Sequence, residues 1–145
     1  MTPKLQYSRN GLKLTEQFEG IRLTAYQDQG GKWTIGYGHT AGVHARMTCT
    51  QTQAEAWLLC DVQEAVNAAN RLILVLLTQC EFDAVVDFIF NVGQGNFAES
   101  TILRLLNAGD FEAAACQFEH WDLCDGKIIA GLLRRREAGK QEFLQ

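Results

Sequence analysis

The chain has 145 residues, of which 47% are hydrophobic and 21% charged, a composition typical of one folded globular domain over residues 1–145. Its longest apolar run, residues 72–77, is far shorter than the roughly 20 residues that span a membrane. The formal net charge of -4 argues against a dedicated nucleic-acid-binding protein. We expect a monomer that binds no nucleic acid and has no stable membrane insertion.

The first third of the chain combines a helix with a β-hairpin. Residues 8–18 have helical spacing of apolar side chains, and Gly20 follows as a stop signal. Residues 23–40 are rich in Tyr, Trp, Thr and Ile around Gly30 and Gly31, a pattern that predicts a hairpin with a glycine turn.

The rest of the chain is expected to be helical. Thr50 with Gln53 and Thr78 with Glu81 have capping-box spacing and predict two helix starts. After the first box, five apolar residues form one helical stripe: Ala54, Leu58, Val62, Ala65 and Ala69. Two short helices are expected after Ser100 and Asp110, the first closed by Gly109, and a last helix is expected around Ile128, Ile129, Leu132 and Leu133.

These elements predict an α+β fold in which a small hairpin region packs beside a mainly helical body. A cleft where the two regions meet is the natural place for an active site. The basic residues lie mostly near the two ends of the chain, at 1–46 and 127–145, and an anionic partner is expected to meet these ends.

The five cysteines are Cys49, Cys60, Cys80, Cys116 and Cys124. Their odd number and the absence of CxxC spacing exclude a disulfide scaffold and a zinc site. We expect them to be reduced and buried as small hydrophobic side chains. No sequence motif indicates a metal or a cofactor.

Two carboxyl groups and a hydroxyl group near the hairpin suggest chemistry. Glu19 lies at the end of the first helix, where the helix dipole disfavours a negative charge and so favours a protonated general acid. Asp28 lies at the hairpin turn, where backbone amides and solvent keep a carboxylate ionised, and Thr34 can fold back near it. Such a set can activate water to split an acetal. Taken alone, a helix-end charge is the commoner explanation for Glu19, and a turn former is the commoner explanation for Asp28.

The spacing of these three residues resembles that of a known family. The stretch 18–40, FEGIRLTAYQDQGGKWTIGYGHT, is similar to the signature of phage lysozymes, the endolysins of glycoside hydrolase family 24, in which Glu, Asp and Thr recur at this spacing. The similarity continues through LTQCEFDAVVDFIFNVGQGNF, STILRLLNAGDFEAAACQF and GLLRRREAGKQEFL, and it covers most of the chain. The resemblance implies a lysozyme-like fold.

The resemblance also implies an activity, a muramidase that hydrolyses the β-1,4 bond between N-acetylmuramic acid and N-acetylglucosamine in bacterial peptidoglycan. Glu19 would donate a proton to the leaving oxygen, and Asp28 with Thr34 would activate a water, with inversion at the anomeric carbon. The N-terminal sequence lacks the membrane segment that some members carry. We therefore expect accumulation in the host cytoplasm and release by a separate holin-type protein, followed by wall degradation and host lysis.

Further residues are candidates for substrate binding. The resemblance places Asn91, Gly93 and Thr101 in segments that line the sugar cleft, although Asn91 and Gly93 also fit simple helix termination. Tyr37 is a candidate for stacking on a sugar, as are Trp33 and Tyr26, but aromatic residues in strands often belong to the core.

Charged residues elsewhere are expected to have structural roles. By similarity to the family, His39 at the end of the hairpin and Asp61 in the following helix form an ion pair that ties the hairpin to the helical body. The run Arg134, Arg135 and Arg136 is typical of a solvated face. The resemblance implies that one of these arginines approaches the cleft near Glu19, without identifying which.

Two other functions compete with a hydrolase. A lytic transglycosylase needs one catalytic Glu and forms a 1,6-anhydro sugar, so an Asp and a Thr at the family spacing argue against it. A non-catalytic wall-binding module of lysozyme type would be favoured by an altered triad, whereas Glu19, Asp28 and Thr34 are all present.

Overall fold

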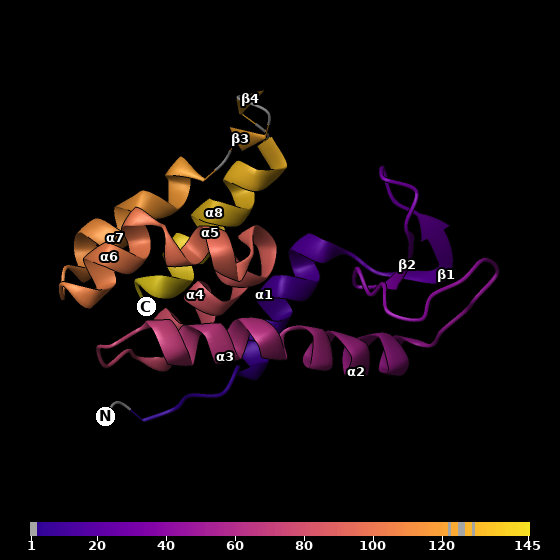
Figure 1. Ribbon diagram of the computed structural model, residues 1–145, viewed down its shortest axis with the longest axis horizontal. Helices are drawn as coiled ribbons and strands as arrows, with labels where there is room; N and C mark the ends of the chain where they lie inside the picture. The colour runs from indigo at the N-terminus through magenta and orange to yellow at the C-terminus, as the bar shows by residue number, and fades with distance from the viewer. Residues whose placement is uncertain (1–2, 122, 125–126, 129) are drawn as a thin grey trace. The chain divides into compact units, whose positions relative to one another are not determined.

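The computed structural model describes residues 3–121, 123–124, 127–128 and 130–145 (Figure 1). The elements follow in this order: α1 (Arg9–Glu19), β1 (Arg22–Gln27), β2 (Trp33–Gly36), α2 (Gln51–Asp61), α3 (Gln63–Leu72), α4 (Gln79–Val92), α5 (Gln94–Ala98), α6 (Thr101–Asn107), α7 (Phe111–Gln117), a 3-10 turn (Phe118–His120), β3 (Leu123–Cys124), β4 (Lys127–Ile128) and α8 (Ala130–Phe143). Within the described residues, no helix is both long and apolar enough to cross a membrane. The predicted α+β class is confirmed.

The chain divides into two compact units. We call Thr15–Glu64 the hairpin unit, and Met1–Leu14 with Ala65–Gln145 the helical unit. Each is described by itself below.

The hairpin unit is built on an antiparallel pair, β1 and β2, in which Tyr26 lies opposite Thr34. Residues 47–49 pair with the other edge of β1, through hydrogen bonds from Ala25 N to Met47 O (2.8 Å) and from Cys49 N to Leu23 O (2.9 Å). Helix α2 packs closely on β2 at Gly36. A Cβ at this glycine would lie 3.0 Å from Ala54 Cβ, and its φ of +64° also favours glycine.

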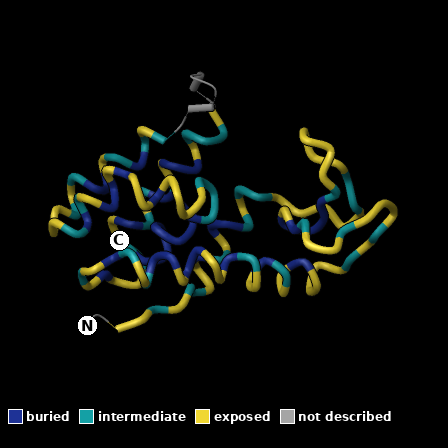
Figure 2. The backbone as a smooth tube through the Cα atoms, in the orientation of Figure 1, coloured by how far each residue is buried: buried dark blue, intermediate teal, exposed yellow. Residues whose placement is uncertain are grey.

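The helical unit is organised around α4. Eight consecutive residues of this helix, Phe82 to Ile89, are buried (Figure 2), as expected for a helix surrounded by others. The ring of Phe88 contacts the rings of Phe97, Phe118 and Trp121 at centroid distances of 6.2, 5.6 and 5.3 Å. These contacts place an aromatic cluster at the centre of the unit.

The predicted helix starts are confirmed. Thr50 and Thr78 each form a capping box, with Gln53 and with Glu81, and Ser100 and Asp110 accept hydrogen bonds as N-caps of α6 and α7. The single stripe expected over residues 54–69 is divided, because α2 ends and α3 begins around Val62. All five stripe residues are nevertheless buried, so the spacing alone does not reveal the break.

The predicted last helix is present as α8, although it begins at Ala130, after Ile128. Ile128 belongs to β4, Ile129 lies outside the described residues, and Leu132 and Leu133 are only half-buried. Helix α8 instead buries Arg135, Arg136, Gly139 and Phe143. At Gly139 a Cβ would lie 3.3 Å from the Phe118 ring, so the missing side chain allows this ring to approach closely.

The expected burial of the cysteines was also wrong where the structure describes them. Cys60 and Cys116 are exposed, and Cys49 and Cys80 are half-buried. These four are free thiols, as predicted. The side chain of Cys124 lies outside the described residues.

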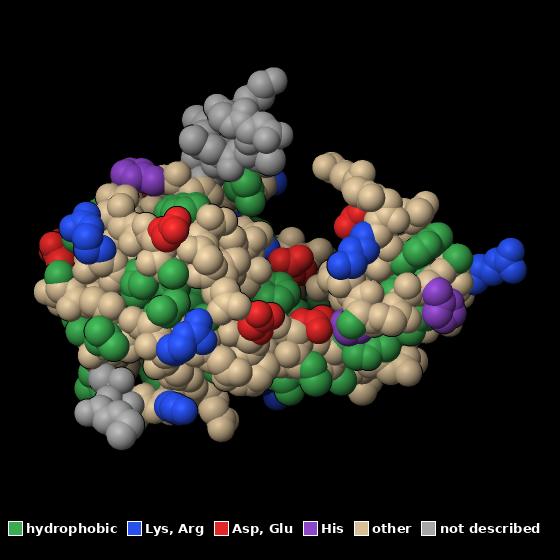
Figure 3. Space-filling model, viewed as in Figure 1, with side chains coloured by type: hydrophobic (Ala, Val, Ile, Leu, Met, Phe, Trp, Pro, Cys, Tyr) green, Lys and Arg blue, Asp and Glu red, His purple; other side chains and the backbone are tan. Residues whose placement is uncertain are grey.

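Charged side chains are dispersed over the face of the molecule shown in Figure 3. On the described part of this face, Lys and Arg side chains lie singly among acidic and apolar ones. Two basic residues near the C-terminus, Arg135 and Arg136, are buried. Their burial reduces the basic surface expected to meet an anionic partner at this end of the chain.

Candidate active site

Glu19 is the last residue of α1, and its side chain is half-buried. Gly20 ends the helix with a φ of +68°. The Glu19 carboxyl group lies against the backbone at Gly38, since a Cβ at that glycine would be 3.4 Å from Glu19 Oε2. Gly38 has a φ of +82°, so both its conformation and its close approach to the carboxyl group favour glycine.

Asp28 is held at the hairpin turn by backbone amides. Its Oδ1 accepts hydrogen bonds from the N–H groups of Gly30 (2.9 Å) and Lys32 (2.8 Å). The side chain is exposed, and Oδ2 has no hydrogen-bond partner among the described residues. One oxygen of the carboxylate is therefore fixed, and the other is open to a water molecule.

Thr34 lies in β2 and is buried, with 4% of its surface exposed. Its hydroxyl donates a hydrogen bond to the carbonyl oxygen of Lys32, at 3.0 Å. Because the hydroxyl has a single proton, a further partner of Thr34 Oγ1 must be a donor. Thr34 is thus prepared to accept a hydrogen bond.

The structure places the three sequence-predicted residues in the hairpin unit, on a helix end, a turn and a strand. Together they supply a carboxyl group that can donate a proton, a carboxylate that can accept one, and a hydroxyl that can orient a water. These are the groups needed to hydrolyse a glycosidic bond. In the described part of the chain, no three His, Cys, Asp or Glu side chains gather as ligands for a metal ion.

His39 and Asp61 lie together within the hairpin unit. His39 Nδ1 is 2.7 Å from Asp61 Oδ2, and the imidazole stacks on the Trp57 ring with centroids 4.8 Å apart. The backbone of His39 pairs with Ile35 through two hydrogen bonds of 2.9 Å, which close the loop that contains Gly38. Residues of α2 therefore hold the loop against which the Glu19 carboxyl group lies.

Tyr37 is buried, with 6% of its surface exposed. Burial raises the pKa of its phenol, and the carboxylates of Glu16 and Glu55 raise it further. This burial favours the packing interpretation of Tyr37 over contact with a sugar. Trp33 and Tyr26 are only half-buried.

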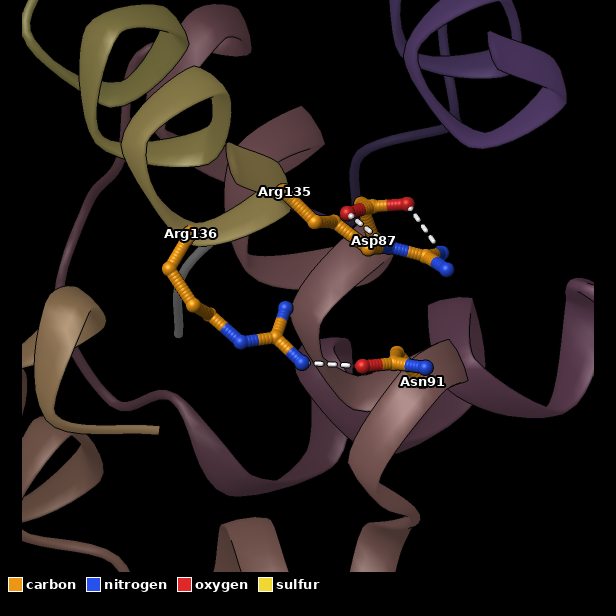
Figure 4. Close-up of polar contacts among 4 residues, drawn as sticks. All are labelled: Asp87, Asn91, Arg135 and Arg136. Carbon is orange, nitrogen blue, oxygen red and sulfur yellow. Dashed lines mark hydrogen bonds and ion pairs between the residues drawn. The ribbon is translucent and has the colours of Figure 1, made fainter. Parts of the chain in front are cut away.

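The other predicted binding residues belong to the helical unit. Gly93 connects α4 to α5 with a φ of +92° and is exposed, and Thr101 is the exposed first residue of α6. Asn91 lies in the last turn of α4, where its side-chain oxygen accepts a hydrogen bond from Arg136 (Figure 4). The structure thus places Asn91 and Gly93 at one helix end.

The prediction that the three arginines form a solvated face was wrong for two of them. Arg134 is exposed, whereas Arg135 and Arg136 are buried. Arg135 forms two hydrogen bonds with Asp87, from Nη2 to Oδ1 (2.7 Å) and from Nε to Oδ2 (3.2 Å), and both side chains are buried. Arg136 is 2% exposed, and burial with the adjacent Arg135 lowers its pKa to about 10. Asp87 was not predicted as a partner from the sequence, although an acidic residue within the apolar pattern of α4 indicates a buried partner.

Comparison with known proteins identifies the family. A model of the phage lysozyme family matches residues 16–139. The chain is 41% identical over 143 residues to the endolysin of Acyrthosiphon pisum secondary endosymbiont phage 1, covering 96% of this chain and 98% of that protein. It is 39% identical over 145 residues to the endolysin of Salmonella phage P22, with coverages of 97% and 99%.

Solved structures agree with this assignment. The muramidase domain of SpmX from Asticaccaulis excentricus has a TM-score of 0.92 at 39% identity, with 97% of this chain and 98% of that chain covered. A mutant of P22 lysozyme has a TM-score of 0.90 at 38% identity, with coverages of 97% and 99%. The predicted resemblance is confirmed, and the chain belongs to the phage lysozyme family, as a peptidoglycan-degrading enzyme of host cell lysis.

Proposed function

We propose that this peptidoglycan hydrolase is an N-acetylmuramidase that cleaves the β-1,4 bond between N-acetylmuramic acid and N-acetylglucosamine with inversion. The observation that carries the proposal is the state of Asp28, with one oxygen fixed by two amides and the other open. A carboxylate held in this way suits a general base that acts on a water. A relative of similar structure, the SpmX domain, is named a muramidase.

In the proposed reaction, Glu19 donates its proton to the glycosidic oxygen as the bond to the anomeric carbon breaks. Its position against Gly38 fixes the carboxyl group for this transfer. General acid catalysis of this kind contributes about 10²–10⁴-fold to the rate.

The attacking water is held by Asp28 and Thr34. It donates one hydrogen to Asp28 Oδ2 and the other to Thr34 Oγ1, whose own proton is bound to the Lys32 carbonyl. A lone pair of the water then remains for the anomeric carbon, and Asp28 takes the proton as the new bond forms. Attack on the face opposite the leaving group gives the α-anomer.

Substrate contacts are proposed for Asn91, Gly93 and Thr101, on the basis of the family resemblance. The chain would act as one catalytic domain and as a monomer. We also propose that it is made in the host cytoplasm and that a holin-type protein gives it access to the wall.

Digestion of purified peptidoglycan, followed by mass spectrometry and early-time NMR of the products, tests the proposal. We expect muropeptides with reducing ends and an initial excess of the α-anomer. Products with 1,6-anhydro ends would indicate a transglycosylase, and an initial β-anomer would make Asp28 a nucleophile. The absence of soluble products would indicate a binding module.

A further inference from the structure

The amide of Asn91 has a defined orientation at the end of α4. Its Oδ1 points toward Arg136 and accepts a hydrogen bond from Nη2, whereas Nδ2 points away (Figure 4). A guanidinium group has only donors, so a flipped amide would place NH₂ against the guanidinium. Arg136 therefore selects one of the two amide orientations.

Arg136 is itself held in place by other contacts. Its Nε donates to the carbonyl oxygen of Trp121 at 3.1 Å, and its guanidinium carbon lies 5.0 Å from the centre of the Phe88 ring. With its side chain almost fully buried, the guanidinium has little freedom to move away from Asn91. The orientation of the amide is thus imposed by a rigid neighbour.

The other end of the amide points away from Arg136 (Figure 4). Among the described residues, no buried polar side-chain atom lacks a hydrogen-bond partner. Asn91 is half-buried, and its Nδ2 donates no hydrogen bond to another described residue. With Oδ1 engaged by Arg136, the group of Asn91 that remains for a ligand is the Nδ2 donor.

We propose that Arg136 is a positioning residue that makes Asn91 a selective donor for an acceptor oxygen of the substrate. The strongest neutral acceptors of the glycan are the carbonyl oxygens of its acetamido groups, so the recognised group is an N-acetyl carbonyl. This inference rests on the proposed function, because it assumes that Asn91 contacts the sugar chain.

Asn91→Asp is the sharpest test. The new carboxylate keeps an oxygen for Arg136 and gains charge attraction, so the melting temperature should not fall. In this variant an oxygen replaces Nδ2, so two hydrogen-bond acceptors, this oxygen and the substrate carbonyl oxygen, would face each other. KM for soluble peptidoglycan fragments should therefore rise about tenfold with kcat nearly unchanged. The matched control is Asn10→Asp at an exposed position of α1, which should leave both constants unchanged. An unchanged KM in Asn91→Asp would overturn the proposal.

A double-mutant cycle tests the role of Arg136. Arg136→Lys should raise KM in the wild-type background and have no further effect on KM in an Asn91→Ala background. An equal KM increase in both backgrounds would show that Arg136 does not act through Asn91.

De-N-acetylated peptidoglycan should abolish the KM difference between wild type and Asn91→Ala. A persistent difference would exclude the acetamido carbonyl as the recognised group.

These results are separable from a failure of the proposed function. Products from the unaltered protein that end in a reducing N-acetylmuramic acid establish the muramidase activity independently of any variant. If the unaltered protein forms these products and the Asn91 variants keep its KM, the contact of Asn91 with the substrate and its positioning by Arg136 are refuted, and the muramidase activity stands.

Discussion

Replacing Asp28 with Asn should remove the general base and leave the hairpin turn in place. The amide oxygen of Asn can accept the same two hydrogen bonds from Gly30 and Lys32 that Asp28 Oδ1 accepts at 2.9 and 2.8 Å. The NH₂ group then takes the place of Oδ2, where it would donate to the water and could not accept its proton. We expect kcat to fall by about 10²–10⁴-fold.

The cost in stability should be small, because both turn hydrogen bonds survive at an exposed site. Each of the two hydrogen bonds is weaker when its acceptor is a neutral amide oxygen than when it is a carboxylate oxygen. We expect the free energy of unfolding to fall by about 1 kcal/mol in total. For a domain of this size the melting temperature would then fall by roughly 2–4 °C. A large loss of activity with a small loss of stability is the specific signature of a catalytic role.

The assay measures initial rates on purified peptidoglycan together with thermal unfolding. Asp110→Asn is the matched control, since Asp110 is also exposed and accepts a backbone hydrogen bond, from Ala113 N at 3.1 Å. Asn is an equally good N-cap, so this variant should keep both rate and melting temperature. If Asp28→Asn retained activity within threefold of the unaltered protein, Asp28 could not be the base.

Five further substitutions have defined outcomes. Glu19→Gln should lower the lysis rate by about 10²–10⁴-fold with the far-UV CD spectrum unchanged. Thr34→Ala should lower kcat less than Asp28→Asn does, if the hydroxyl only orients the water. Arg135→Met should lower the unfolding free energy in urea by about 3–5 kcal/mol, because the buried Asp87 carboxylate loses its bidentate cationic partner. The control Arg134→Met should change it by less than about 0.5 kcal/mol. The raised pKa of the buried Tyr37 phenol implies that stability is lost as pH rises above the ordinary value of 10.0, and Tyr37→Phe should reduce this alkaline loss.

The hairpin unit could be predicted largely from sequence because its determining interactions are local. The turn at Asp28 is closed by amides two and four residues away, and Thr34 bonds a carbonyl two residues away. Glycine turns, alternating strand residues and a helix stop are all visible in such a short window. The approach of Gly38 to Glu19 was not visible, because it depends on how the loop folds back toward α1.

The charged centre of the helical unit could not be predicted in the same way. Arg135 and Asp87 are 48 residues apart in sequence, and Arg136 and Asn91 are 45 apart. A run of three arginines fits a solvated surface unless the carboxylate and aromatic partners are known. The packing of α8 on α4 supplies these partners, and only the folded structure reveals which arginine remains exposed.

Lys32 connects the two groups that hold the proposed water, and it does so through its backbone. Its N–H donates to Asp28 Oδ1, and its carbonyl oxygen accepts hydrogen bonds from Asp28 N and Thr34 Oγ1. The proposed base, Asp28, and the proposed orienting hydroxyl of Thr34 are therefore fixed relative to the same peptide groups. Because the Lys32 side chain is exposed and takes no part in these bonds, the geometry depends on the course of the chain at this position and not on the lysine. A short turn can thus hold the water-activating groups without a dedicated side chain between them.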